Sequence, residues 1–430
     1  MTTPAAVPTL LQAAARCRQA GQFQKAERLC GQVLAAVPRQ PDALHLLAVI
    51  CAQNRRYAEA NDFFARALAA APSRADFHGN YANALWEQER VDEAVAACKR
   101  SIALDARRAE VHNILGNALL AQGQAAEAVS CFRRALVLRP AYPHALNNLG
   151  NALQKQGSME EAVSAYRQAL VMLPDYPEAH NNLGLALKSL GKIGEAASSF
   201  RRALSLHPDF PQAAANFAEV DPAWLVPLEG KKLRLRRYRE EDAAYLRGCF
   251  QDAGFMARYN HNIPRHQSLE ELAKKLRKAQ DAHPCQSRAV DWIILRRDGG
   301  QPVGIANLVE IQFAHRRAEF LIGLPDPADR ASGIGLEATL LVLDHAFNKV
   351  GINKLTTLVY GDNLSSQQNT LALGFVQESH LREHLAEPDS GSFLDLYGNG
   401  MTQGDFRANA RLARLSRRLL GWDATSRKGN

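Results

Sequence analysis

The first half of the chain repeats itself with a period of 34 residues, as the spacing of Ala14 and Ala48 illustrates. Such self-similarity marks a stacked repeat architecture, and it constrains the fold more than any other feature of this sequence. A position for small residues is filled by Ala14, Ala48, Ala82, Gly116, Gly150 and Gly184. A bulkier series comprises Cys30, Phe64, Cys98, Phe132, Tyr166 and Phe200. The repeats close at Pro38, Pro72, Pro140, Pro174 and Pro208, with Ala106 in the remaining place.

This pattern predicts that each repeat is a pair of antiparallel helices. The small residues allow the two helices of a pair to approach closely, and the bulkier residue is expected to fill the space between neighbouring pairs. A proline cannot continue a helix, so it marks the turn into the next repeat. Because one pair cannot bury its apolar face alone, we expect the copies to stack into a superhelical solenoid.

The repeats resemble the tetratricopeptide repeat (TPR) family over about residues 7–210. Six repeats fit, and a single helix near 211–220 follows them, so we assign residues 7–220 to an all-α TPR solenoid. The resemblance implies a concave groove that takes a protein or peptide partner.

Asparagines recur on the first helix of several repeats, with Ile114 interrupting the series. The Asn-Asn-Leu-Gly motifs that contain two of them resemble the repeats of O-GlcNAc transferases, which implies that they hydrogen-bond the backbone of an extended peptide. Alternatively, they bridge helices within the solenoid. The candidate groove residues are Asn80, Asn148, Asn182 and Asn216.

The helical period ends near residue 220, and residues 221–231 read as a connector with two prolines and a glycine. Residues 232–406 alternate strand and helix patterns, which predicts an α/β or α+β layered domain with a mixed sheet. Strands are expected near 233–236, 290–296, 303–312, 317–324 and 354–359, and two more end near 404. A long helix is expected over 335–349, and Ser268 with Glu271 forms a capping box at the start of another.

A glycine-rich turn, Arg330-Ala331-Ser332-Gly333-Ile334-Gly335, joins a predicted strand to the long helix. Glycines let the backbone come close to a ligand, and free amides at a helix N-terminus suit a diphosphate. Dinucleotide-binding folds also use such a turn, but their GxGxxG fingerprint is absent here.

The segment 301–384 resembles GNAT acetyltransferases, particularly the branch of the ribosomal-protein Nα-acetyltransferases and several amino-sugar acetyltransferases. The RxxGxG/A turn of the family is matched at Arg330, Gly333 and Gly335, and its second motif begins at Asn363. The resemblance implies acetyl-CoA as cofactor, with the turn on its diphosphate and a strand backbone along its pantetheine arm. The implied contacts are Leu321, Ile322, Gly323, Leu324, Arg330, Ser332, Gly333, Ile334, Gly335, Asn363 and Ser366.

Acyl transfer to an amine requires a base that removes a proton from the amine. The candidates are Glu319 and Glu310, on strands expected to line the cleft; a salt bridge to a neighbouring arginine is the alternative for Glu319. Thr370 stands where many GNAT enzymes carry a tyrosine that protonates the thiolate. The acceptor is expected against the segment between the first two helices of the domain, where an aromatic and polar mix suits a sugar or a peptide terminus. The acceptor candidates are Phe255, Tyr259, Asn260 and His261.

The net charge of +8 favours anionic partners, but no arginine-rich tract with interleaved aromatics indicates nucleic acid. The seven cysteines form no CxxC pair, so we expect reduced thiols and no metal site. Without a signal peptide or a run of about 20 apolar residues, a cytoplasmic protein is expected. The basic tail, residues 407–430, places arginines on one helix face, which is either solvated or contacts an anionic ligand.

Three functions follow from these features. The first is an acetyltransferase that modifies a protein amine, with the solenoid recruiting a partner or the substrate. The second is N-acetylation of a nucleotide-linked amino sugar for surface glycans, with the solenoid as an assembly module. The third is a scaffold with an inactive GNAT domain, which the intact glycine turn disfavours.

Overall fold

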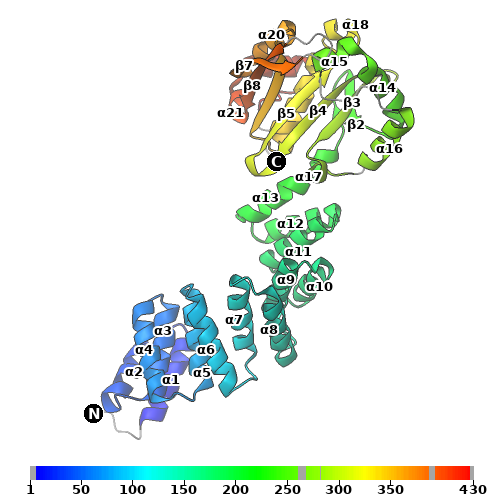
Figure 1. Ribbon diagram of the computed structural model, residues 1–430. Helices are drawn as coiled ribbons and strands as arrows, with labels where there is room; N and C mark the ends of the chain where they lie inside the picture. The colour runs from blue at the N-terminus through cyan, green and yellow to red at the C-terminus, as the bar shows by residue number, and fades with distance from the viewer. Residues whose placement is uncertain (1–5, 260–267, 281, 387–392, 427–430) are drawn as a thin grey trace. The chain divides into compact units, whose positions relative to one another are not determined.

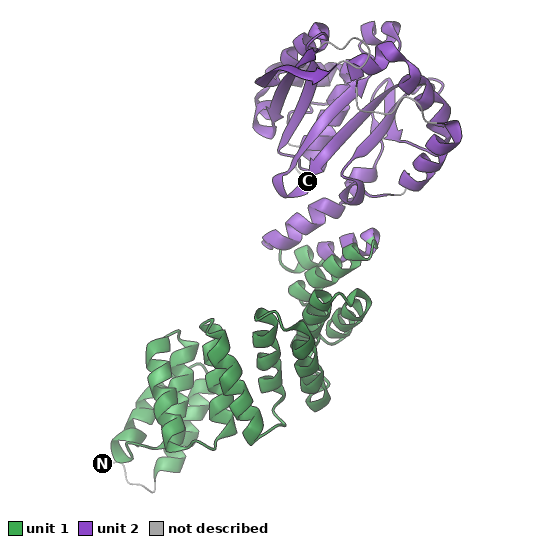
Figure 2. Cartoon of the chain, in the orientation of Figure 1, with its two compact units in different colours: residues 1–192, 202–208 green, residues 193–201, 209–430 purple. Residues whose placement is uncertain are grey.

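The computed structural model describes residues 6–259, 268–280, 282–386 and 393–426. The chain divides into two compact units (Figure 2). The first comprises Met1–Lys192 and Arg202–Pro208, and the second comprises Ile193–Arg201 and Asp209–Asn430. Within the described ranges, no helix is both long and apolar enough to cross a lipid bilayer.

The first unit consists of antiparallel helices, each packed against the next (Figure 1). They are α1 (Val7–Gln19), α2 (Phe23–Ala36), α3 (Pro41–Gln53), α4 (Tyr57–Ala70), α5 (Ala75–Glu87), α6 (Val91–Leu104), α7 (Ala109–Ala121), α8 (Ala125–Leu138), α9 (Pro143–Gln156), α10 (Met159–Met172) and α11 (Pro177–Ser189). Helix α12 (Ile193–Leu206) continues the series in sequence. The all-α repeat array predicted from the period is confirmed.

The small and bulky series of the repeat meet inside each helix pair. A Cβ atom added to Gly150 in α9 would lie 2.5 Å from the ring of Tyr166 in α10, and one added to Gly116 in α7 would lie 2.6 Å from the Phe132 ring in α8. The bulky residue therefore packs within its own pair, whereas the sequence placed it between pairs. It does both at Phe64, whose ring centroid lies 5.0 Å from that of Tyr81 in the next repeat.

The second unit is built around an eight-stranded sheet with the order β1-β2-β3-β4-β5-β6-β8-β7. The strands are β1 (Leu228–Glu229), β2 (Leu233–Arg237), β3 (Val290–Arg296), β4 (Pro302–Gln312), β5 (Arg317–Gly323), β6 (Lys354–Tyr360), β7 (Val376–Ala386) and β8 (Phe393–Thr402). Among the strands of the described residues, only β5 and β6 pair in parallel, and the other neighbours are antiparallel. The predicted mixed sheet is confirmed.

Helices pack on both faces of this sheet. The helices that follow the repeats are α13 (Pro211–Val220), α14 (Ala243–Gln251), α15 (Ala253–Tyr259), α16 (Leu269–Ala279), α17 (Pro284–Ser287), α18 (Pro327–Ala331), α19 (Ile334–Asp344), α20 (Leu364–Ala372), α21 (Gln403–Ala408) and α22 (Ala410–Leu419). Helices α14 to α16 pack on the face that carries Ile305, and α19 and α22 pack on the face that carries Ala306. This separation follows from the alternation of side chains along β4.

Two local features fix the ends of these helices. Ser268 and Glu271 form the predicted capping box at the start of α16, while α19 ends at Asp344 and continues as a π-helical turn to Lys349.

Helix α13 belongs to the second unit, where it packs against α17. The domain limits at residues 220, 231 and 406 stay predictions.

Candidate active site

Strands β5 and β6 begin as a pair and then separate. Their pairing starts with Arg317 opposite Lys354 and ends with Glu319 opposite Thr356. On its other side, β5 stays paired with β4 as far as Gly323. Beyond Glu319, the β6-facing edge of β5 thus has no strand partner in the described part of the chain. Such an edge can take an extended ligand as an additional strand.

The separation opens into a cavity of about 670 Å³. Its walls come from β5, β6, α15, α19, α20 and α22 and the turn before α19. The sequence candidates that line it are Phe255, Tyr259, Leu321, Ile322, Gly323, Leu324, Arg330, Gly333, Gly335, Asn363 and Ser366. The structure adds lining residues that no sequence motif marked, namely Thr357, Leu358, Ser365, Asn369 and Leu415. The unfilled edge of β5 and the glycine turn therefore face one cavity.

The glycine turn presents free backbone amides to this cavity. Gly333 has a φ of +81°, and a Cβ atom added to it would meet nothing within 4 Å. The described residues provide no acceptor for the amides of Gly333 and Gly335, as expected in the first turn of a helix. The amide of Ser332 differs from the sequence expectation: it donates to the carbonyl oxygen of Asp329 at 3.2 Å. Ser332 is the C-cap of α18, and this position commits its amide to that helix.

Two further polar groups come from the start of α20. The Asn363 side chain caps this helix, because its Oδ1 accepts a hydrogen bond from the Ser366 amide at 3.2 Å. Both residues also line the cavity. The capping role and the predicted ligand role are compatible. Both hydrogen bonds of the Asn363 side chain to described residues, from the Ser366 amide and the Ser365 hydroxyl, are accepted by its Oδ1.

An aromatic pair from α15 forms part of the cavity wall. The rings of Phe255 and Tyr259 are stacked with centroids 5.1 Å apart. Both press on Gly323, where an added Cβ atom would lie 2.6 Å from Phe255. The other acceptor candidates, Asn260 and His261, lie outside the described residues.

A buried polar chain that the sequence did not indicate supports this pair. The Tyr259 hydroxyl donates to Asn307 Oδ1, and Asn307 Nδ2 donates to Asp291 Oδ1 at 2.5 Å. Burial raises the pKa of Asp291 above its ordinary value and the pKa of Tyr259 well above its own. These residues lie on three separate elements, so no spacing in the sequence connects them.

Neither candidate base lines the cavity. Glu319 is the last residue of β5 that pairs with β6, and the two strands separate after it. Its side chain is half-buried. Burial raises the pKa of its carboxyl group, and the nearby charge of Glu310 adds to this effect. Glu310 is exposed at a bulge of β4 and has a φ of +50°.

The charges on the cavity wall are of one sign. Four arginines line it, Arg258, Arg330, Arg411 and Arg418, and no aspartate or glutamate does so among the described lining residues. A wall of this kind attracts a polyanion.

Two of the candidate groove asparagines of the solenoid bond to asparagines of the preceding repeat. Asn148 Nδ2 donates to Asn113 Oδ1 of the preceding repeat at 3.1 Å, and Asn182 Nδ2 donates to Asn147 Oδ1 at the same distance. Their donors thus bridge adjacent repeats, as the alternative interpretation expects. Asn216 lies on α13, within the second unit.

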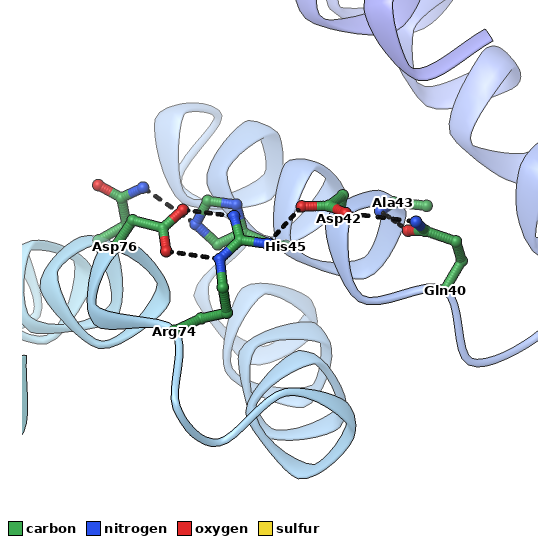
Figure 3. Close-up of polar contacts among 7 residues, drawn as sticks. Gln40, Asp42, Ala43, His45, Arg74 and Asp76 are labelled. Carbon is green, nitrogen blue, oxygen red and sulfur yellow. Dashed lines mark hydrogen bonds and ion pairs between the residues drawn. The ribbon is translucent and has the colours of Figure 1, made fainter. Parts of the chain in front are cut away.

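Near the start of the solenoid, Asn80 contacts His45 instead, with 2.9 Å between its Nδ2 and the His45 Nε2. His45 lies beside the ion pairs that Arg74 makes with Asp42 and Asp76, at 3.0 and 2.7 Å (Figure 3). Burial lowers the pKa of His45 to about 4, so the ring is neutral at neutral pH. The polar surface of this repeat therefore differs from that of the Asn-Asn-Leu-Gly repeats.

Comparison with protein families accounts for both units. Residues 232–376 match the acetyltransferase (GNAT) domain, and residues 11–75, 52–118, 113–177 and 147–214 match tetratricopeptide repeats. The chain carries tetratricopeptide repeats and a C-terminal GNAT acetyltransferase domain. The GNAT domain makes the protein an acyltransferase. The narrower branch expected from the sequence stays a prediction.

Curated relatives match the GNAT domain. An uncharacterized N-acetyltransferase, YoaA of Bacillus subtilis, is 26% identical over 158 residues, which cover 37% of this chain and 87% of the relative. Spermidine N(1)-acetyltransferase of Escherichia coli is 29% identical over 149 residues, which cover 35% of this chain and 75% of that enzyme.

Solved structures resemble one part or the other. Spermidine N-acetyltransferase of Vibrio cholerae, in complex with CoA and spermine, has a TM-score of 0.36 at 22% identity, covering 40% of this chain and 97% of that one. The structure of Pseudomonas aeruginosa pilF has a TM-score of 0.45 at 22% identity, covering 49% and 95%.

Proposed function

We propose that the GNAT domain transfers an acetyl group from acetyl-CoA to a primary amine, and that the repeats recruit a protein partner or the substrate. The observation that carries the proposal is that free amides at the start of α19 and the unpaired edge of β5 share one cavity. The first suits a diphosphate, and the second suits an extended arm. The four arginines of the wall add the positive charge that a nucleotide requires.

The residues of the cavity fit each part of this cofactor. The free amides of Gly333 and Gly335 would hold the diphosphate, and open space above Gly333 leaves room for it. The Ile334 amide would join them by giving up its 3.4 Å hydrogen bond to Ser332 Oγ. The β5 backbone from Leu321 to Leu324 would pair with the pantetheine arm, and Asn363 with Ser366 would contact the arm from α20. When bound, acetyl-CoA supplies an acetyl group activated as a thioester.

The chain itself has two tasks in the reaction. A free amide on the unpaired edge of β5 would donate a hydrogen bond to the acyl oxygen as its negative charge grows. Glu319 would accept a proton from the amine, directly or through water, and its raised pKa brings it closer to the working range of a base at neutral pH. Thr370, which lines the cavity, is a far weaker acid than the tyrosine of other GNAT enzymes, so water is left to protonate the thiolate.

The role of Glu319 is tested by its pH profile. A base acts when deprotonated, so kcat/KM should rise with pH through the raised pKa, and Glu319→Gln should lower it by roughly 10²-fold or more. Glu310→Gln is the matched comparison. It removes a neighbouring negative charge, so it should lower the Glu319 pKa and shift the rise to lower pH without abolishing activity. An unchanged rate in Glu319→Gln would exclude this residue as the base.

The acceptor is either a protein amine or an amino sugar. The stacked pair of Phe255 and Tyr259 offers a flat apolar surface, which suits a sugar ring or a peptide terminus. Arg258 lies beside this pair on the cavity wall. Its charge would repel a polycation such as spermidine, the substrate named for the Escherichia coli relative, and would favour the phosphates of a nucleotide-linked sugar.

Thiol release from acetyl-CoA distinguishes these acceptors in the full chain. The panel contains nucleotide-linked amino sugars, polyamines and peptides with free N-termini. Asn182→Ala removes the bonds of Asn182 to Asn147 and Asn151 and so alters the groove. If the solenoid delivers a peptide, this variant should raise KM for the peptide and leave KM for a free amino sugar unchanged. If none of these amines raises thiol release above the rate of acetyl-CoA hydrolysis, the acceptor lies outside the panel and acetyl-CoA as cofactor is not contradicted. Failure to bind acetyl-CoA at all would overturn the proposed function.

A further inference from the structure

The C-terminal helix α22 reaches the cavity although it lies beyond the segment that matches the GNAT family, which ends at residue 376. Asn409 caps the helix, since its Oδ1 accepts a hydrogen bond from the Leu412 amide at 3.0 Å. Its side chains Arg411, Leu415 and Arg418 line the cavity. These positions are four and three residues apart, so they form one stripe along the helix.

A second face of α22, which carries Leu412 and Ser416, anchors it in the core. Leu412 and Ser416 are fully buried, and the Ser416 hydroxyl accepts a hydrogen bond from the Ala424 amide at 3.0 Å. The Ala424 carbonyl in turn accepts a hydrogen bond from Asn348, just after α19. Lys231 donates to the Arg418 carbonyl at 3.0 Å. The stripe therefore has a fixed position on the cavity wall.

The charges of this stripe are not neutralised within the protein. Neither Arg411 nor Arg418 forms an ion pair with another described residue, whereas Arg417 on the same helix pairs with Asp423 at 2.7 Å. Both arginine side chains are exposed to the cavity, and Leu415 between them is half-buried. Two unpaired guanidinium groups on either side of an apolar side chain suit a phosphate monoester attached to an aromatic base.

We propose that α22 forms the nucleotide end of the cofactor site, where Arg411 and Arg418 bind the 3′-phosphate of CoA and Leu415 packs against the adenine ring. The inference rests on the proposed use of acetyl-CoA. The diphosphate already has the amides that precede and begin α19 together with Arg330, so the 3′-phosphate is the anionic group that still needs a partner. It carries about two negative charges at neutral pH, which match the two arginines.

The test is the preference of the full chain for CoA over 3′-dephospho-CoA, measured by isothermal titration calorimetry. Wild-type protein should bind CoA roughly tenfold or more tightly than 3′-dephospho-CoA, because charge-assisted hydrogen bonds to the phosphate are lost. The double variant Arg411→Ala/Arg418→Ala should lose most of this preference while its affinity for 3′-dephospho-CoA stays unchanged.

Arg414→Ala is the matched control, because Arg414 is an exposed arginine of the same helix that does not line the cavity. It should keep the wild-type preference. A double variant that still prefers CoA, or a wild-type protein that binds both nucleotides equally, would overturn the role of α22 and leave the acetyl-CoA site intact. Absence of binding for both nucleotides in wild-type protein would refute the proposed function itself.

Discussion

His345 makes the stability of the GNAT domain depend on pH. Its side chain is 3% exposed and lies edge-on against two indoles, with ring centroids 6.1 Å from Trp224 and 5.6 Å from Trp292. Burial lowers the pKa of His345 from 6.5 to about 4, because a charged ring would lose its hydration there. The charge of Lys349 acts in the same direction.

The sign and size of the effect follow from linkage. Because the pKa is lower in the folded state, the unfolded chain binds more protons at every pH between 6.5 and about 4. The free energy of unfolding therefore decreases as the pH falls through this window. The full difference corresponds to about 3 kcal/mol, of which about 2 kcal/mol is lost by about pH 5.

The assay compares wild-type protein with His345→Leu, which cannot titrate. Unfolding by denaturant is followed by tryptophan fluorescence between about pH 8 and pH 5, since Trp224 and Trp292 flank the site. Other groups, such as His283 with its lowered pKa, contribute equally to both proteins. Wild-type protein should lose about 2 kcal/mol more than the variant over this range. Parallel pH dependences in the two proteins would show that His345 is not the source of the pH-dependent stability.

Two further predictions concern packing and a buried ion pair. Gly150→Ala should destabilise the solenoid by about 1–3 kcal/mol, because the added Cβ atom would overlap an aromatic ring. Gly31→Ala, on another helix with open space around it, should stabilise the solenoid by about 0.5–1 kcal/mol. Unfolding by denaturant measures both changes. Asp242 is buried and forms a bidentate ion pair with Arg236, so Asp242→Asn should lower the free energy of unfolding by about 3–5 kcal/mol. Glu241 is exposed, so Glu241→Gln should lower it by about 1 kcal/mol or less. Equal effects within either pair of variants would contradict these assignments.

The sequence was most informative where one environment recurs. Each 34-residue copy supplies the same contacts, so the small residue at Gly150 and the bulky one at Tyr166 could be assigned from their series alone. The helix against which the bulky residue packs could not be predicted. A repeat period indicates that a position is buried but not which neighbouring helix buries it. The glycine turn was also predictable, since only a turn with a positive φ at Gly333 requires that residue.

The remaining parts of the site depend on long-range pairing. Nothing near Glu319 in the sequence marks the point where β5 and β6 separate, because that point depends on how far β6 stays in register. The hydrogen bonds that link Tyr259, Asn307 and Asp291 also join three elements that are far apart in the sequence. The arginine spacing of the tail predicted a basic helix face, but only the packing of α22 against α19 decides what that face meets.

The proposed acetyl-CoA site requires the backbone at Gly333 to lie close to the diphosphate of CoA. Gly333→Ala would place a methyl group in the open space over the turn, and Gly300→Ala is the control, since Gly300 also has a positive φ and open surroundings but lies in the β3–β4 turn, away from the cavity. Both variants carry similar backbone strain. Calorimetry should show CoA affinity reduced roughly tenfold or more in Gly333→Ala and unchanged in Gly300→Ala. Equal CoA affinity in both variants and in wild-type protein would contradict the proposed site.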